Sequence, residues 1–301
     1  MPNQRKPILR RTCAALAAAA VCAAVSQLWY LPHYRAHQTP VEANADGNGI
    51  CVMSANVRCY SPTDLGRKSW LYRADLLLRD VAAEQPDVIG FQEVTALHYR
   101  YLTRNLQGYA SVIAYRDRSL LSEGCPVFYN TLRFTLRDKG SFWLSETPER
   151  SSKDWGAAFP RVCSYVILTE NATGRDFVVF NTHLDHVSDE ARIRGIGVVL
   201  DKLRQFGDLP CVLMGDLNAG EDSETYRAAT ADFDDAKYRT ADPPKGPTYQ
   251  HFGAAADAEN IDYFLISKTG IAVSDYRIVD TTYDGVYPSD HFPIVLRMAL
   301  V

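Results

Sequence analysis

The sequence predicts an α/β fold in which two packed β-sheets are flanked by helices, and two observations carry this prediction. The first is a series of short apolar runs of strand length, as expected for strands that are covered on both faces. The second is that amphipathic stretches lie between these runs, at 70–85 and 190–206, where apolar residues recur every three or four positions. With 47% hydrophobic residues, the 301-residue chain can bury a sizeable core.

The chain begins with the pattern of an export leader. Four basic residues within the first 11 positions precede an alanine-rich apolar run over 12–25 that holds no charge. Small residues at 24–26 suit a signal peptidase, whereas the apolar continuation to Leu31 would let the segment span a bilayer. We therefore expect residues 1–31 to be a cleaved signal peptide or an uncleaved membrane anchor. In either case the remainder is expected outside the cytoplasm, in the periplasm or the extracellular space.

Residues 32–49 are polar and hold Pro40, Gly47 and Gly49, so we expect a linker there. The first strand-like run begins at Ile50, and one domain is expected over 50–301. Strands are expected at 51–55, 88–91, 111–114, 127–129, 161–169, 177–181, 211–214, 263–266 and 294–298.

The expected domain is acidic. The first 49 residues hold five of the 32 Lys and Arg and two of the 36 Asp and Glu, which leaves 27 positive against 34 negative charges. Proteins that bind nucleic acids strongly draw their affinity from basic surfaces. We therefore expect no strong nucleic-acid binding, and we expect a monomer.

The cysteines favour buried thiols over a metal or disulfide framework. Five of the seven lie in the expected domain, and none forms a Cys-x-x-Cys pair, so structural zinc is not expected. An odd number fits poorly with complete pairing. Whether Cys51 and Cys59 form a disulfide stays open at this stage.

Polar side chains follow six of the apolar runs, at the points where strands should end. The clusters are Asn56, Gln92-Glu93, Asn181-Thr182-His183-Leu184-Asp185, Gly215-Asp216-Leu217-Asn218, Asn260-Ile261-Asp262 and Ser289-Asp290-His291. Strand ends at one edge of a fold converge in space, so these clusters are expected to line one cleft.

The chemistry of these clusters matches the hydrolysis of phosphate esters. That reaction needs a hard divalent cation, a group that positions or deprotonates water, and donors for the phosphoryl oxygens. Carboxylate and amide oxygens suit Mg²⁺, and imidazole and amide N–H groups suit phosphate. Taken singly, Asn56 could end a strand, Glu93 could cap a helix, and a lone histidine is usually structural. Independent turns, however, have no reason to place this set after successive strands.

With these motifs, residues from about 50 to 301 resemble the endonuclease/exonuclease/phosphatase superfamily, which has the fold of pancreatic-type deoxyribonuclease. Gln92-Glu93, Gly215-Asp216-Leu217-Asn218 and Ser289-Asp290-His291, in this order, carry the resemblance. It implies a DNase I-like four-layer α/β sandwich and a metal-dependent hydrolase that uses Mg²⁺, with Mn²⁺ as a possible substitute.

The resemblance also implies roles at the metal and at the attacking water. Glu93 resembles the principal Mg²⁺ ligand of the family, and Asn56 and Asp290 would complete or support the metal shell. Asp216 would orient or deprotonate the water. Asn218 would hydrogen-bond the water or the phosphate.

Four further residues would act on the phosphate. His291 would stabilise the phosphoryl oxygens, with Asp262 fixing its orientation through the other ring nitrogen, and His183 would donate to the scissile phosphate. Arg161 resembles a phosphate-contacting arginine, although a surface salt bridge is the alternative. Asp185 and the neighbouring His186 would act either as supporting groups or as groups on the substrate side.

Two differences from the sequence motifs of particular subfamilies argue against membership in them. Arg58 stands where abasic-site endonucleases carry an acid, and Asp262 lacks the signature that precedes this aspartate in inositol polyphosphate 5-phosphatases. The segment 140–148, followed by Trp155 and Arg161, resembles exported bacterial hydrolases related to the deadenylase branch. Trp143, Trp155, Tyr249 and Phe252 would form an aromatic wall that stacks on a base or sugar, with core packing as the alternative for Trp143.

The sequence is therefore compatible with three functions. The first is an Mg²⁺-dependent phosphodiesterase or phosphomonoesterase, with a nuclease among the options, that acts on a small molecule, a lipid head group or a nucleotide. The second is a membrane-tethered, sphingomyelinase-like lipid phosphodiesterase. The third is a catalytically silent binding module. The third requires the loss of Glu93, Asp216, Asp262 or His291, and all four are present.

Overall fold

The computed structural model describes the chain except for residues 1–20, 23–24, 26, 62 and 255–257. Most of the expected signal peptide or anchor therefore lies outside the described residues. Within the described part of the chain, no helix is both long and apolar enough to cross a membrane.

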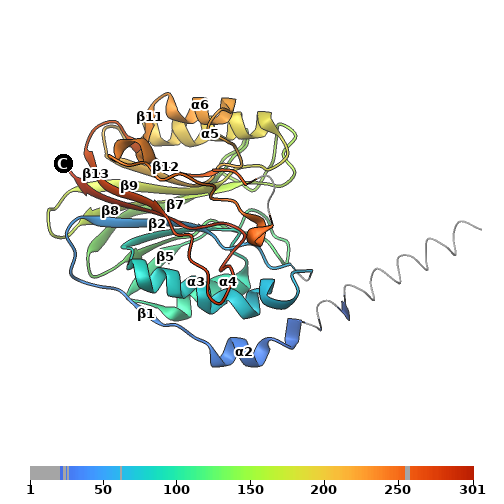
Figure 1. The fold of residues 1–301 in the computed structure, drawn as a ribbon. Helices are drawn as coiled ribbons and strands as arrows, with labels where there is room; N and C mark the ends of the chain where they lie inside the picture. The colour runs from blue at the N-terminus through green and yellow to red at the C-terminus, as the bar shows by residue number, and fades with distance from the viewer. Residues whose placement is uncertain (1–20, 23–24, 26, 62, 255–257) are drawn as a thin grey trace, which may run out of the picture.

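Two six-stranded mixed sheets pack face to face (Figure 1). The first has the order β13 (Ile271–Ile278), β14 (Ile294–Leu300), β2 (Ile50–Asn56), β3 (Val88–Gln92), β6 (Val127–Asn130) and β5 (Tyr109–Val112). The second has the order β11 (Phe233–Asp235), β12 (Asp262–Ser267), β10 (Cys211–Asp216), β9 (Asp176–His183), β8 (Val162–Glu170) and β7 (Phe134–Trp143). A short parallel pair, β1 (Val41–Glu42) with β4 (Leu106–Gln107), lies apart from both.

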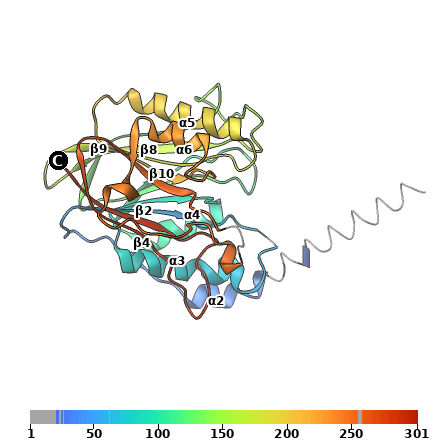
Figure 2. The ribbon, with the colours of Figure 1, turned by 45° about the horizontal axis from the view of Figure 1, so that its top comes forward.

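Helices cover the outer face of each sheet, and both views show the resulting four layers (Figures 1 and 2). Helices α3 (Trp70–Glu84) and α4 (Ala96–Asn105) lie against the first sheet, and α5 (Asp189–Arg204) and α6 (Glu224–Thr230) lie against the second. Three short 3₁₀ helices lie in connections: η1 (Gly66–Lys68), η2 (Ala236–Arg239) and η3 (His251–Gly253). The predicted four-layer α/β sandwich is confirmed.

The core explains why the central strands read as continuous apolar runs. All seven residues of β2 are buried, because one face meets the other sheet and the opposite face meets α3. Between the sheets, Val52 and Leu296 of the first sheet belong to the same buried cluster as Val179 and Phe264 of the second.

Two long strands at sheet edges were not predicted from the sequence. In β7 and β13, buried and exposed positions are interleaved, because an edge strand of a sandwich is covered incompletely. Because β7 and β13 contain many polar residues, they lack the continuous apolar runs by which the central strands were predicted.

The expectation of an irregular linker over 32–49 needs correction. This segment contains most of helix α2 (Leu31–Ala36) and the whole of strand β1. The rings of His33 and Tyr72 stack 4.2 Å apart, and Tyr34 packs on Tyr101 at 5.2 Å. Thr39 hydrogen-bonds Asp75 of α3. The segment is ordered because its aromatic side chains cover α3 and α4, a tertiary effect that overrides the turn-forming residues.

The described cysteines are free thiols, and Cys51 and Cys59 are not bridged. Cys51, Cys125, Cys163 and Cys211 are buried, as expected for structural thiols.

Candidate active site

The strand register brings the predicted polar residues of the second sheet into one row. Asp216 at the end of β10 is paired with His183 at the end of β9 and with Asp262 at the start of β12. In the first sheet, Asn56 ends β2 and is paired with Gln92, which Glu93 follows. The Asn56 Nδ2 donates to Asp216 Oδ2 across the sheets at 3.0 Å. The predicted convergence of strand ends is therefore present.

A buried polar layer beneath these residues fixes the two sheets relative to each other. Gln92 Nε2 donates to Asn181 Oδ1 at 2.7 Å, and Asn181 Nδ2 donates to the carbonyl oxygen of Phe91 at 2.8 Å. Both side chains are fully buried. Because a buried amide is costly to leave unpaired, this network specifies the register in which the site residues meet.

The backbone turns sharply at two site residues. Glu93 has φ 61° and Asn218 has φ 48°, the left-handed region that non-glycine residues rarely adopt. Gly215 has φ 141°, and an added Cβ there would lie 1.9 Å from the carbonyl oxygen of Thr182. The glycine of the Gly-Asp-Leu-Asn motif is thus required for the close approach of β10 to β9, which places Asp216 beside His183.

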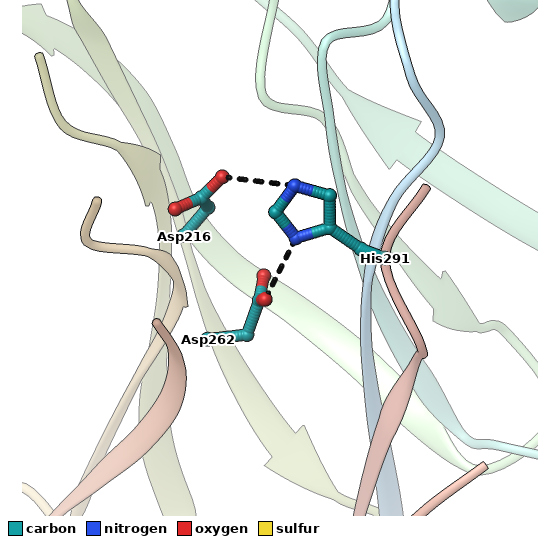
Figure 3. A group of neighbouring side chains, drawn as sticks. All are labelled: Asp216, Asp262 and His291. Carbon is teal, nitrogen blue, oxygen red and sulfur yellow. Dashed lines mark hydrogen bonds and ion pairs between the residues drawn. The ribbon is translucent and has the colours of Figure 1, made fainter. Parts of the chain in front are cut away.

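A buried Asp–His–Asp arrangement forms the floor of the site (Figure 3). His291 Nδ1 lies 2.8 Å from Asp262 Oδ2, and its Nε2 lies 3.7 Å from Asp216 Oδ2. Burial alone would lower the pKa of His291, but Asp262, Asp216 and Asp290 outweigh it and raise the pKa to about 10. His291 is therefore an imidazolium at neutral pH, with its Nδ1 hydrogen-bonded to Asp262.

Asp216 has the properties of a base that works near neutral pH. Burial and the nearby Asp262 raise its pKa to about 7, against the opposing effect of His291. Its Oδ1 accepts the backbone N–H of Asn218 at 2.8 Å, and its Oδ2 accepts from Asn56. A carboxylate with a pKa close to ambient pH can both accept and release a proton.

Glu93 and Asp290 are the residues that fit a hard divalent cation. Glu93 Oε2 accepts the Cys59 N–H at 2.6 Å and Oε1 accepts from Asn56 at 3.1 Å, so the carboxylate is held in place. Burial would raise the pKa of Glu93, but these two donors and the charge of His291 hold it below its usual value. Asp290 is buried as well, at 3% exposure. The buried carboxylates of Glu93 and Asp290 suit Mg²⁺, which prefers oxygen ligands.

Asp216, Asp262 and His291 also place donor atoms within 4.8 Å of one another, as a metal site could. In this group, however, both ring nitrogens of His291 already face carboxylates, Nδ1 at 2.8 Å from Asp262 and Nε2 at 3.7 Å from Asp216. We therefore favour the carboxylates Glu93 and Asp290 for the metal.

Asn56 acts as a bridge between carboxylates in this arrangement. Its NH₂ group donates to Glu93 and Asp216, and its Oδ1 accepts the Arg58 N–H at 2.9 Å. This orientation fits support of the metal shell better than direct ligation.

His183 is neutral in the structure and faces Asn218. Burial lowers its pKa well below 6.5, and Arg161 adds to the effect although Glu93 opposes it. Asn218 Nδ2 donates to His183 Nε2 at 2.8 Å and to the carbonyl oxygen of Leu184 at 3.1 Å. His183 and Asn218, which were both expected to contact the phosphate, therefore lie next to each other.

Arg161 does not form a surface salt bridge, because it is only 5% exposed and lines the cleft. Its Nη2 donates to His186 Nδ1 at 2.8 Å, and its Nε lies 3.4 Å from Asp185 Oδ2. Asp185 also accepts backbone N–H groups of Ala158, Val187 and Ser188. Asp185 therefore connects the two loops that carry Arg161 and His186, and His186 itself lines the cleft.

The cleft above these residues has a volume of about 660 Å³. The sequence interpretation missed several of its residues, which lie in loops without a motif: Cys59, Arg116, Glu123, Phe159 and Glu259. Of the four aromatic residues considered for a wall, Tyr249 alone lines this cleft. Trp143 instead donates Nε1 to the Arg116 carbonyl oxygen, and the Phe252 ring lies beneath the cations of Lys68 and Arg73.

This fold and this constellation define the class of metal-dependent hydrolases of phosphoric esters. The chain belongs to the Endonuclease/Exonuclease/phosphatase family, whose model matches residues 53–291.

Solved structures of bacterial relatives are similar over most of the chain. An endonuclease/exonuclease/phosphatase from Bacteroides vulgatus is 26% identical with a TM-score of 0.78, over 85% of this chain and 100% of that one. The mannosyl-6-phosphatase of Bacteroides thetaiotaomicron is 28% identical with a TM-score of 0.75, over 83% of this chain and 100% of that one.

A curated relative comes from a much longer protein. The Ccr4 3'-5'-exoribonuclease subunit of the CCR4-Not complex from Yarrowia lipolytica is 25% identical over 227 residues, which is 60% of this chain and 32% of the relative. The chain thus spans about a third of the length of that relative.

Proposed function

We propose that this protein is an Mg²⁺-dependent hydrolase of small phosphate esters that acts outside the cytoplasm. The observation that carries the proposal is that Glu93 after β3, Asp216 at the end of β10, and the neighbours Asp290 and His291 before β14 line one cleft. The basic and apolar leader supports export.

The geometry supports a division of labour among the residues of the chain. Asp216 accepts a proton from water as the water oxygen attacks phosphorus and the bond to the leaving alcohol breaks. The imidazolium of His291 donates to a phosphoryl oxygen and is held by Asp262. Arg161 binds a further oxygen through its guanidinium N–H groups. Asn218 Nδ2 donates to His183 Nε2 and to the Leu184 carbonyl oxygen, so these two residues reach the phosphate only when their mutual hydrogen bond breaks. A divalent cation at Glu93 and Asp290 would neutralise negative charge on the phosphate.

Three observations favour a small substrate. The cleft volume of about 660 Å³ lies in the range that holds a single small ligand. The acidic balance of residues 50–301 disfavours a long nucleic acid. The similarity to a mannosyl-6-phosphatase provides a precedent for a small phosphomonoester in this fold.

A lipid phosphate ester is the second candidate, because the N-terminal segment meets the fold beside the cleft. Gln27 Nε2 donates to the carbonyl oxygen of Asp64, and Asp64 pairs with the cleft residue Arg58. Trp29 is 85% exposed and Leu65 is 51% exposed. If the leader is an anchor, these exposed apolar side chains would be available to contact the membrane surface.

A substrate panel distinguishes these candidates. We expect the purified protein with Mg²⁺ to turn over sugar phosphates or nucleotides, with slower turnover of a single-stranded RNA oligonucleotide and of phospholipid in vesicles. Preferred turnover of vesicle phospholipid would replace the first candidate by the second. Absence of turnover on every phosphomonoester and phosphodiester, including p-nitrophenyl phosphate and its bis-ester, would reject the proposed function.

A further inference from the structure

Arg58 places a permanent positive charge next to a candidate metal ligand. Its Nη1 lies 3.4 Å from Asp290 Oδ2. On its other side, its Nε and Nη2 donate to the two carboxylate oxygens of Asp64 at 3.1 and 3.4 Å. The guanidinium therefore bridges Asp64 and Asp290 at the wall of the cleft.

Several contacts fix this position of Arg58. Its backbone has φ 59°, and its N–H donates to Asn56 Oδ1, so the chain turns back towards the site directly after β2. Asp64 is supported from behind by the hydrogen bond of Gln27 to its carbonyl oxygen at 2.6 Å. The contact with Asp290 is thus part of an ordered loop rather than a chance meeting of surface charges.

Arg73 ties the two segments that carry Arg58 and Asp290 together. It is fully buried, and its Nη2 donates to the Arg58 carbonyl oxygen at 2.9 Å while its Nη1 donates to that of Pro288 at 3.0 Å. One guanidinium therefore sets the spacing between the Arg58 backbone and the loop that leads into Asp290.

The positive charge of Arg58 acts on Asp290 with little screening by water, because the Asp290 side chain is only 3% exposed and lies 3.4 Å from the guanidinium. A second divalent cation bound on this side of Asp290 would be repelled by the guanidinium.

We propose that Arg58 fills the position of a second metal ion beside Asp290, so that the centre binds one divalent cation. This inference rests on the proposed function, since it assumes the metal at Glu93 and Asp290. In two-metal sites the ions lie roughly 3.5–4 Å apart and share ligands. Here the oxygen of Asp290 that a second ion would share already faces the guanidinium at 3.4 Å.

Metal stoichiometry tests the proposal without reference to activity. The full chain, purified in mild detergent, is titrated with Mn²⁺, and free Mn²⁺ is measured by electron paramagnetic resonance. We expect one tight site in the wild type. Arg58→Gln removes the positive charge and is expected to bind two Mn²⁺ ions, whereas Arg58→Lys keeps the charge and is expected to bind one.

Two tight sites in the wild type, one site in a folded Arg58→Gln, or two sites in Arg58→Lys would overturn the proposal. Circular dichroism establishes whether each variant is folded, and if Arg58→Gln is unfolded, Arg58→Met is titrated in its place with the same expected result. A wild type that binds no Mn²⁺ would count against the metal centre of the proposed function itself. One tight site without turnover of any ester would reject that function and leave the stoichiometry inference standing.

Discussion

Asp216→Asn is expected to lower kcat by about 10³-fold, the size of effect typical of a lost general base, while the fold is retained. The asparagine Oδ1 can still accept the Asn218 N–H, which Asp216 accepts at 2.8 Å, but it cannot take a proton from water. The loss should therefore appear in kcat, measured from steady-state turnover of the best ester in the panel.

Asp201→Asn is the matched control, because Asp201 lies on the exposed face of α5, where it pairs with Arg204. Its turnover should equal that of the wild type. Retention of wild-type kcat in a folded Asp216→Asn, to within about threefold, would remove Asp216 from its assigned role.

Glu93→Gln is expected to raise the Mg²⁺ concentration needed for half-maximal activity by more than about 100-fold, because even the loss of a group that only supports a ligand costs 10–100-fold. The amide keeps the volume of the side chain, but it removes the negative charge that Asn56 and the Cys59 N–H hold in place. Isothermal titration with Mn²⁺ measures the loss of affinity directly.

Glu190→Gln, an exposed position on α5, provides the same chemical change away from the cleft. It should bind Mn²⁺ as the wild type does. Unchanged Mn²⁺ affinity in Glu93→Gln would shift the metal to other residues, with Asp216, Asp262 and His291 as the first alternative.

The central strands and the strand-end motifs could be predicted because each is a local pattern. A strand buried on both faces, such as β2, is an apolar run, and the residue that follows it is polar because it reaches the cleft. Asp216 lies beside His183 and Asp262 because of the register of their strands. This proximity was expected because strand ends converge at one edge of the fold.

The remainder depends on contacts that no local pattern encodes. Helix α2 is ordered by packing on Tyr72 and Tyr101, far along the chain. In the sequence, Arg58 indicated only a difference from the abasic-site endonucleases. Its position at the site is set by ion pairs with Asp64 and Asp290, and Asp290 lies more than 200 positions away in the sequence. Similarly, Arg116 and Phe159 stack at 4.4 Å on the cleft wall through loops without periodicity.

Removal and return of the metal tests the metal dependence of the proposed hydrolase directly. We expect the protein to lose its phosphate-ester turnover when dialysed against EDTA and to regain it when Mg²⁺ is added back, with Asp216→Asn inactive throughout. Turnover that persists after EDTA at the wild-type rate would contradict a metal-dependent centre built on Glu93 and Asp290.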